Sequence, residues 1–124
     1  MESKESIIKN YFNAWINNDD SNLRNVFAED IVYSECYGPE YHGINQILVW
    51  FTDWHKHGRV LKWDIHQFIH SDNMTVVEWY FQYEYDGKID GFNGVSIIEF
   101  CMDLKIRNLK EFESKAEHIY PYEK

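Results

Sequence analysis

The longest alternation of apolar and polar residues in the chain runs from Met74 to Tyr85. Val77, Trp79, Phe81 and Tyr83 fall on one side of it, and Glu78, Tyr80, Gln82 and Glu84 fall on the other. A period of two is typical of a strand with one buried face. Asp86-Gly87 is a turn sequence, so we expect a hairpin whose second strand covers Phe92 to Cys101. The aromatic row is so large that something must pack against it or bind in front of it, and we expect helices to cover part of this face and a ligand pocket to take the rest.

The first half of the chain repeats its apolar residues at helical spacing instead. Three helices are expected: Glu5 to Asn17, a short one with Leu23, Val26 and Phe27 as apolar positions, and Ile44 to His57. Ser3 suits the N-cap of the first helix and Asn17-Asn18 its end. Gly58 is predicted to be the C-terminal glycine of the third helix.

Further strands are predicted on both sides of the third helix. They are expected at Asp30 to Glu35, Leu61 to Ile69 and Arg107 to Glu113, with Trp63, Ile65, Gln67 and Ile69 sharing one face of the second. Glu40, Tyr41 and His42 are expected to form a loop before Gly43. The tail from His118 to Tyr122 is expected to dock onto the domain by its aromatic rings.

Helices followed by a meander of strands predict an α+β domain in which a bent antiparallel sheet wraps a long helix. At 124 residues, with no repeat or linker, the chain is expected to form one domain, residues 1–124.

The amino-acid composition disfavours some classes of binding partner and favours others. A formal charge of −9 without a cluster of Lys or Arg disfavours nucleic acid and anionic membranes. Hydrophobic residues at 44%, with 18% aromatic, favour a globule with a lined cavity for a small hydrophobic molecule. Cys36 and Cys101 suit core thiols in a reducing cytoplasm. We expect neither a signal peptide nor a membrane span.

No motif predicts a metal or a cofactor. His55 and His57 are spaced to point apart on a helix, and His66 and His70 are about 13 Å apart at strand rise. Neither pair has clear metal-ligand spacing, and no zinc-type cysteine cluster or phosphate-binding glycine loop is present. His66 or His42 acting alone as a general base stays an alternative.

Four motifs in this order resemble the nuclear transport factor two-like superfamily, and more closely its SnoaL-like and ketosteroid-isomerase-like branch. They are Tyr11-Phe12-Asn13-Ala14-Trp15, Val26-Phe27-Ala28-Glu29-Asp30, Gly43, and Gly94 to Phe100, within a similarity from Ile7 to about Glu113. The resemblance implies a cone-shaped, cystatin-like roll. This scaffold carries isomerases, dehydratases, cyclases, hydrolases and inert binding modules, so fold alone does not give function.

The resemblance also implies catalytic roles. Tyr11 falls where ketosteroid isomerases keep the tyrosine that donates to the substrate oxyanion, and Glu35 where they keep the proton-shuttling carboxylate. A phenol donor facing a carboxylate base is the minimum apparatus for enolising a carbonyl compound. Ser96 replaces a second donor, a neutral carboxylic acid, and donates more weakly. Phe51 replaces a supporting tyrosine.

Nine residues are expected to line the ligand pocket: Trp15, Phe51, Trp54, Trp63, Trp79, Phe81, Tyr83, Ile98 and Glu111. Three of the polar assignments have alternatives. Tyr11 would also suit a core tyrosine, and Glu35 a solvated loop carboxylate, although burial among Tyr33, Cys36 and Tyr37 would raise its pKa. Glu111 matches an inward-facing position of the family, but its charged neighbours favour an exposed side chain.

Two functional hypotheses follow. The first is a SnoaL-like protein that binds a hydrophobic, carbonyl-bearing ligand and enolises, isomerises or cyclises it. The second is a non-catalytic ligand-binding or dimeric module on the same fold. A homodimer is expected through the outer sheet face, where Tyr80, Val95 and Ile97 leave apolar area. Convergence of Tyr11 and Glu35 in one cavity would favour catalysis.

Overall fold

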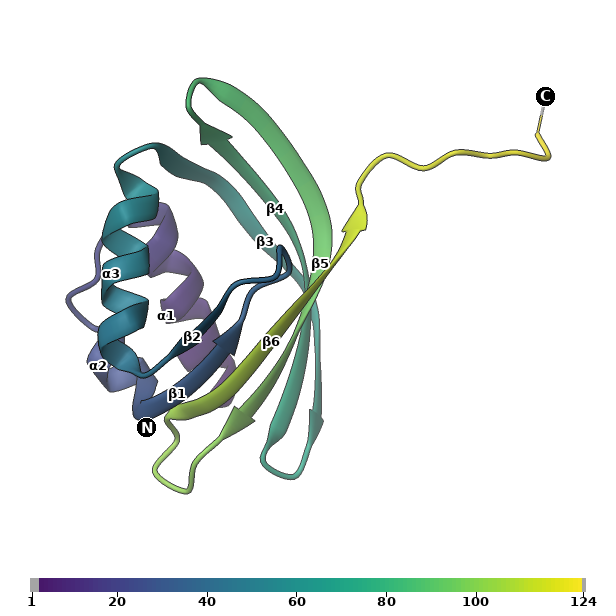
Figure 1. Cartoon of the computed structure of the whole chain (residues 1–124). Coiled ribbons are helices and arrows are strands. Elements are labelled where there is room, and N and C mark those ends of the chain that lie inside the picture. Colours follow the sequence, from purple (N-terminus) through teal and green to yellow (C-terminus); the bar gives the residue numbers. More distant parts are fainter. Residues whose placement is uncertain (1–2, 124) are drawn as a thin grey trace.

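The computed structural model describes residues 3–123, which contain three helices and six strands (Figure 1). The elements are α1 (Lys4–Asn17), α2 (Leu23–Val26), β1 (Phe27–Ser34), β2 (Glu40–His42), α3 (Ile44–His55), β3 (Gly58–Ser71), β4 (Met74–Tyr85), β5 (Lys88–Phe100) and β6 (Ile106–Lys115). The predicted α+β class is confirmed.

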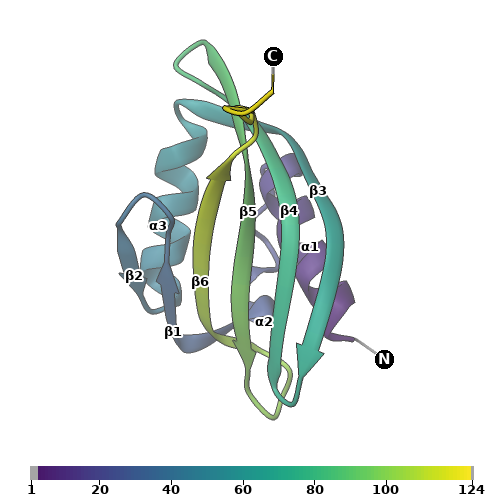
Figure 2. The same ribbon diagram turned by 90° about the vertical axis from the view of Figure 1, so that its right-hand side faces the viewer.

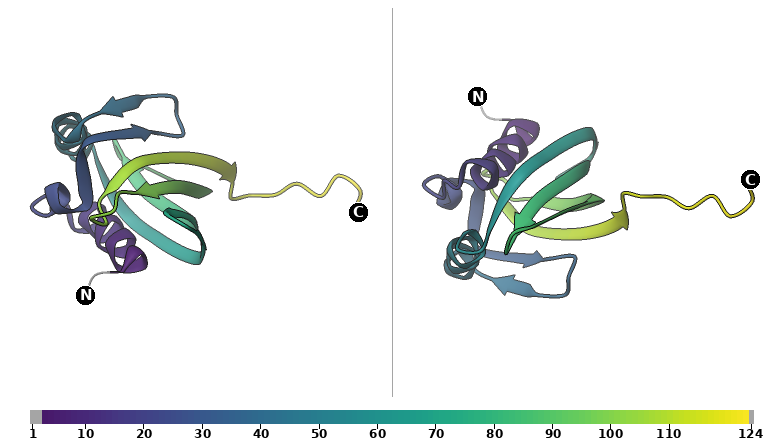
Figure 3. Two further views of the ribbon diagram at one scale, coloured as in Figure 1. Left: turned by 90° about the horizontal axis from the view of Figure 1, so that it is seen from below. Right: turned by 90° about the horizontal axis from the view of Figure 1, so that it is seen from above.

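The six strands form one sheet in the order β2-β1-β6-β5-β4-β3. Every neighbouring pair is antiparallel except β1 and β6, which run parallel, so the expectation of a purely antiparallel sheet was wrong for this pair. The long strands bend, and all three helices lie on the concave side (Figures 1 and 2). Seen from below and from above, the described residues place no helix over the convex side of the sheet (Figure 3).

The ends of α1 are determined by its polar flanking residues. The Ser3 side chain accepts from the Ser6 backbone N–H, and the Ser6 side chain accepts from the Ser3 N–H, which is a capping box. Asn18 adopts a left-handed φ of 51° and ends the helix, as predicted. No helix within residues 3–123 is long and apolar enough to cross a membrane.

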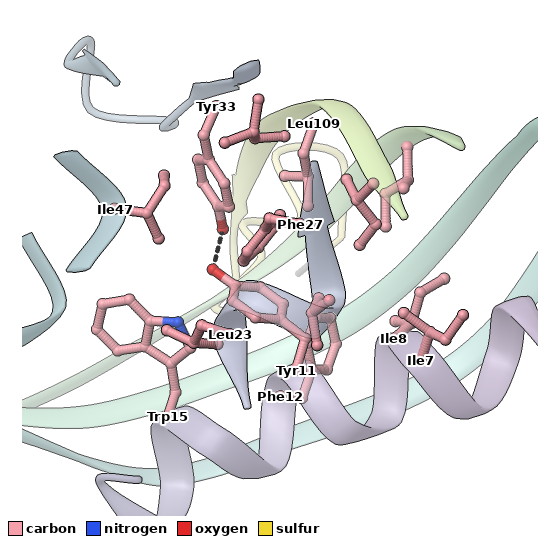
Figure 4. Packing of buried hydrophobic residues seen from close by; sticks show 14 of the residues in the cluster. Ile7, Ile8, Tyr11, Phe12, Trp15, Leu23, Phe27, Tyr33, Ile47 and Leu109 are labelled. Atoms are coloured by element: carbon pink, nitrogen blue, oxygen red, sulfur yellow. Dashed lines mark hydrogen bonds between the residues drawn. The ribbon is translucent and has the colours of Figure 1, made fainter. Parts of the chain in front are cut away.

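The predicted alternation along β4 is confirmed. Val77, Trp79 and Phe81 are buried on the concave side, and Glu78 lies on the other side. The side chains of α1 point into the same space and pack against Phe27 and Leu109 (Figure 4). The concave face of the sheet and the inner faces of the helices therefore form one core.

The Trp79 indole lies over Gly94, its partner on β5. A Cβ at Gly94 would stand 2.2 Å from the Trp79 ring, a distance that no side chain tolerates. The Trp79 Nε1–H donates to Ser96 Oγ at 2.9 Å, which fixes the ring across the strand. Glycine at position 94 is therefore what lets a large ring lie flat on this sheet.

Two predictions about β3 were wrong. A bulge between Ile65 and Gln67 shifts the alternation, so that Phe68 packs against the core and Ile69 is 55% exposed. Gly58 opens the strand instead of ending α3. A Cβ at Gly58 would stand 2.8 Å from the Tyr85 ring, so close approach of β4 explains this glycine.

Three other boundaries also differ from expectation. Phe27 belongs to β1 and not to the second helix, and residues Glu40–His42 pair with β1 as a short strand instead of forming a loop. The aromatic tail does not dock: Ile119 is 88% and Tyr122 98% exposed, and the segment leads away from the sheet (Figure 1).

We expect Gly94→Ala to destabilise the fold by about 1–3 kcal/mol, because the new methyl group must displace the Trp79 ring or the strand. Urea unfolding measures the change. The same substitution introduced into a Trp79→Leu background should cost less, since a smaller side chain leaves room for the methyl group. An equal cost in both backgrounds would contradict this account.

Candidate functional site

Two hollows open between the helices and the β4–β5 hairpin. The outer groove has a volume of about 1180 Å³. It is lined by Glu35, Tyr37, Tyr41, Asn45, Gln46, Val49, Trp50, Asp53, Trp54, Lys56, His57, Tyr83, Tyr85, Lys88 and Asp90. The inner cavity measures about 30 Å³, enough for one or two water-sized groups. Its walls are Trp15, Tyr33, Glu35, Cys36, Tyr37, Trp50, Trp54, Trp63, Trp79, Phe81, Phe92 and Glu111.

Four residues belong to both hollows and form the neck between them: Glu35, Tyr37, Trp50 and Trp54. The Trp50 ring stacks on Tyr41 with centroids 4.5 Å apart and packs against Trp15 at 4.7 Å. This contact connects α3 to β2 on one side and to α1 on the other. The aromatic neck therefore separates a roomy outer space from a small, nearly dry inner one.

A chain of three hydrogen-bonding side chains crosses the core to the inner cavity. The Tyr11 hydroxyl donates to the Tyr33 oxygen at 2.8 Å (Figure 4), and the Tyr33 hydroxyl donates to Glu111 Oε2 at 2.6 Å. Both phenols are fully buried. Burial, and next the Glu111 charge, hold the pKa values of Tyr11 and Tyr33 well above the ordinary value, so both phenols stay protonated.

Glu111 is the deepest carboxyl of this site. Burial raises its pKa to about 8; the Tyr33 hydrogen bond opposes the shift and the Glu35 charge adds to it. At neutral pH the Glu111 carboxyl is therefore mainly neutral and can donate as well as accept. The alternative of an exposed Glu111 was wrong. Its neighbours Lys110 and Glu113 are charged, but strand alternation sends Glu111 inward.

Glu35 follows the last residue of β1, at the neck. Burial raises its pKa to about 7, and a hydrogen bond from the Tyr41 hydroxyl at 3.3 Å opposes this shift. The predicted direction of the pKa shift and its cause are thus confirmed, and a solvated loop carboxylate is ruled out. A carboxyl with this pKa is close to half ionised at neutral pH, which suits both taking up and releasing a proton.

The predicted site residues divide into two groups. Eight line a hollow: Trp15, Glu35, Trp54, Trp63, Trp79, Phe81, Tyr83 and Glu111. Tyr11, Phe51, Ser96 and Ile98 line neither. Tyr11 stands behind Tyr33, so the expected convergence of Tyr11 and Glu35 in one cavity was wrong, and the Ser96 hydroxyl is occupied by the Trp79 indole.

Phe51 and Ile98, the two apolar residues of this set that line neither hollow, point to other parts of the core. Phe51 turns to Trp15 and His55 on the buried side of α3. Ile98 is on the concave face, but it pairs with Thr75 and Leu109 away from the two hollows.

Sequence reasoning missed Tyr33 and Tyr41 as partners of the two carboxyls. The inward position of Tyr33 was visible from the alternation of β1, but its bond to Glu111 spans 78 positions of the sequence. Tyr41 lies on β2, which was expected to be a loop. Both contacts depend on the pairing of distant strands, which local patterns do not encode.

No group of three or more His, Cys, Asp or Glu side chains in residues 3–123 could hold a metal ion. His42 and His66, the alternative bases, are exposed and line neither hollow. His55 is bound to the backbone oxygens of Phe51 and Trp15. The carboxyl pair is therefore the chemistry that this site offers.

The raised pKa of Glu111 makes stability depend on pH. Between about pH 4.5 and 8 the folded protein keeps a proton that the unfolded chain has lost, so the free energy of unfolding falls as pH rises through this window. Glu111→Gln removes the ionisation and keeps an acceptor for Tyr33. We expect the variant to lie close to the parent at pH 5 and to exceed it by on the order of 4 kcal/mol at pH 9.

Urea unfolding at both pH values measures this difference. Glu113→Gln, which changes an exposed carboxylate on the same strand, is the matched control and should leave the gap between pH 5 and pH 9 unchanged. A Glu111→Gln protein that loses stability at pH 9 would show that the carboxylate itself holds the fold together.

Solved structures share this architecture at low sequence identity. An epoxide hydrolase of the LEH-like type from Mycobacterium tuberculosis has a TM-score of 0.79 at 13% identity, over 90% of this chain and 82% of its own. A proposed SnoaL-like polyketide cyclase from Shewanella putrefaciens has a TM-score of 0.77 at 14% identity, over 91% and 90%. A hypothetical protein with a ketosteroid-isomerase-like fold from Catenulispora acidiphila, in complex with trimethylamine, has a TM-score of 0.75 at 15% identity, over 92% and 88%.

Identities of this size show the fold and do not transfer an activity. No protein with a curated functional description matches the sequence. The family model described as a SnoaL-like domain does match, over residues 8–109, which is most of the chain and includes Tyr11, Glu35 and Ser96. The chain belongs to the SnoaL-like family and has the nuclear transport factor two-like fold.

Proposed function

We propose that this chain binds a hydrophobic, carbonyl-bearing molecule and catalyses its enolisation, the first step of an isomerisation or a cyclisation. The observation that carries the proposal is the pair of carboxyls in one aromatic cavity, with pKa values raised to about 7 for Glu35 and about 8 for Glu111. Near neutral pH such a pair offers one base and one acid at the same time.

The sizes of the two hollows support a division of the ligand. The groove can hold a molecule of drug-like size against Trp54, Tyr83 and Tyr85, whereas the inner cavity holds only a group of one or two heavy atoms. The ligand body therefore lies in the groove and its carbonyl end passes the neck. The relative from Catenulispora acidiphila, in complex with trimethylamine, supports small-molecule binding on this scaffold.

The reaction begins when the Glu35 carboxylate removes a proton from the carbon next to the carbonyl. The electron pair of that C–H bond forms the C=C bond of an enolate, and the carbonyl electrons move to oxygen. The neutral Glu111 carboxyl hydrogen-bonds to this oxygen and keeps its proton. Returning the Glu35 proton to a carbon conjugated with the enolate re-forms the C=O bond and gives an isomer. In a cyclisation, the enolate carbon attacks a second carbonyl carbon of the ligand, the electron pair of that C=O bond moves to its oxygen, and this oxygen takes the proton from Glu35.

Tyr11 has an indirect role in this scheme. Its hydroxyl donates to Tyr33, which donates to Glu111, so charge that develops at Glu111 is stabilised through two buried phenols. The direct donor to the ligand is then Glu111 and not Tyr11. Ser96 holds the Trp79 wall in place and takes no part in proton transfer.

Deuterium exchange tests the proposal without knowledge of the natural substrate. In D₂O, proton NMR should show that the protein accelerates exchange at the carbon next to the carbonyl of a hydrophobic ketone such as 2-tetralone. Glu35→Gln should lower this rate at least about 100-fold, the usual contribution of a general base. It should leave stability at pH 7 unchanged or improved, because it removes a carboxylate with a raised pKa.

Glu29→Gln is the matched control, because Glu29 is an exposed carboxylate on β1. It should leave both the exchange rate and stability unchanged. If Glu35→Gln instead costs more than about 1 kcal/mol of stability and leaves exchange unaffected, Glu35 is a structural partner of Tyr41 and the catalytic proposal fails.

One observation favours a second candidate, an assembly module. The convex face carries an apolar patch formed by Val76, Tyr80, Val95, Ile97 and Phe112, in which Phe112 is 54% exposed and pairs directly with Val95. Sheet faces of this kind are suited to contact with a second copy of the chain. Binding through this patch is compatible with catalysis and with its absence.

We expect light scattering to report a homodimer at high micromolar concentration and Phe112→Lys to shift the protein to monomer, because a buried unpaired charge opposes association. Ile89→Lys, at an exposed position of the β4–β5 hairpin, is the control and should leave the dimer intact. A parent protein that is monomeric throughout this range would rule out the interface.

A further inference from the structure

The indole N–H of Trp63 is a buried donor without an acceptor. Trp63 is 8% exposed, and among residues 3–123 its Nε1 and that of Trp15 are the buried side-chain N or O atoms with no hydrogen-bond partner. A buried donor left unpaired costs about 1–3 kcal/mol, so native proteins contain few of them. The position of such an atom is informative when it lines a cavity.

The two indoles differ in their surroundings. Trp15 lies beside the Tyr11 hydroxyl, whose pKa it lowers, so a neighbouring oxygen partly compensates its N–H. The Trp63 indole makes ring contacts with four aromatic side chains. Its ring stacks on Phe12 with centroids 3.8 Å apart and meets the edges or faces of Tyr11, Trp79 and Phe81.

Trp63, on β3, forms part of the wall of the inner cavity. Because Phe12 covers one face of its ring and the N–H lies in the ring plane, an acceptor must approach along the ring edge. The inner cavity is the hollow that Trp63 lines, and no charged nitrogen is among its other lining groups. An acceptor carried into this cavity by a ligand would therefore lie against the indole whose N–H has no partner among residues 3–123.

We propose that the Trp63 indole N–H binds the acceptor oxygen of the ligand, so that the end of the ligand inserted into the inner cavity carries a hydrogen-bond acceptor. Ketones, esters and quinones have such an end. An ammonium group has only donors and would leave Trp63 unpaired. The inference names the substrate class of the proposed enolisation and rests on the same cavity, but it concerns binding and not proton transfer.

Two ligands of the same shape separate the contribution of the hydrogen bond from that of shape complementarity. Cyclohexanone and methylenecyclohexane differ only in a C=O against a C=CH₂ group. In ¹H–¹⁵N spectra of the parent protein, with the Trp63 signal assigned from its absence in Trp63→Phe, cyclohexanone should move the Trp63 indole proton downfield. Methylenecyclohexane should not move it downfield. The shift is read from the parent protein, and Trp63→Phe serves only to assign the signal.

Affinity gives an independent test. Trp63→Phe keeps an aromatic ring on Phe12 and removes the N–H. We expect it to weaken cyclohexanone binding about fivefold to tenfold, the effect of one hydrogen bond, and to change methylenecyclohexane binding less than twofold. Trp54→Phe, at a Trp that lines both hollows and whose N–H is not among the unpaired donors, should affect both probes equally.

A Trp63 signal that stays in place while cyclohexanone binds would overturn the inference, as would equal weakening of both probes by Trp63→Phe. Failure of cyclohexanone to bind would overturn it too. These results can be distinguished from the results of the deuterium-exchange test of enolisation. Binding through Trp63 without deuterium exchange would refute catalysis alone, and exchange without involvement of Trp63 would refute this inference alone.

Discussion

The packing of the Trp79 indole over Gly94 is the contact on which the rest of the core depends. The ring lies across two strands, held by Ser96, and supplies the floor against which Trp63, Phe81 and Phe92 meet edge to face. A larger residue at position 94 would lift this floor toward the helices. The inner cavity exists because such bulky, rigid rings meet at angles that leave space between them.

Burial of two carboxyls in that space opposes stability, and the protein compensates only in part. Glu111 receives one short hydrogen bond from Tyr33, and Glu35 one long bond from Tyr41. No Lys or Arg lines the inner cavity, so neither ionised form is balanced by an opposite charge. A site optimised for stability would carry amides or apolar groups here. Retaining ionisable groups at a cost in stability is typical of a functional site.

The sequence predicted well which face of the sheet a residue occupies. It predicted less well which end of the concave face opens into a hollow. Alternation placed Val77, Trp79 and Phe81 correctly on the concave side, yet Val77 lines neither hollow. The open end depends on how α1 and α3 are seated, and no local pattern encodes that. The bulge in β3 likewise reversed the facing of Phe68 because the insertion arises from pairing with β4. The Glu35 pKa shift was predictable because burial among neighbouring aromatic residues suffices to cause it.

The division between groove and cavity gives the two carboxyls different access to protons. Glu35 lines both hollows, so its proton can exchange with solvent through the groove. Glu111 lines only the inner cavity and accepts from Tyr33 at the end of a buried hydrogen-bonded chain, so its proton is kept away from the outer groove. A group that must take up and return a proton in each cycle needs the first kind of access. A group that must stay protonated while oxygen charge develops benefits from the second. The geometry therefore favours Glu35 as the carboxyl that moves protons and Glu111 as the one that retains its own.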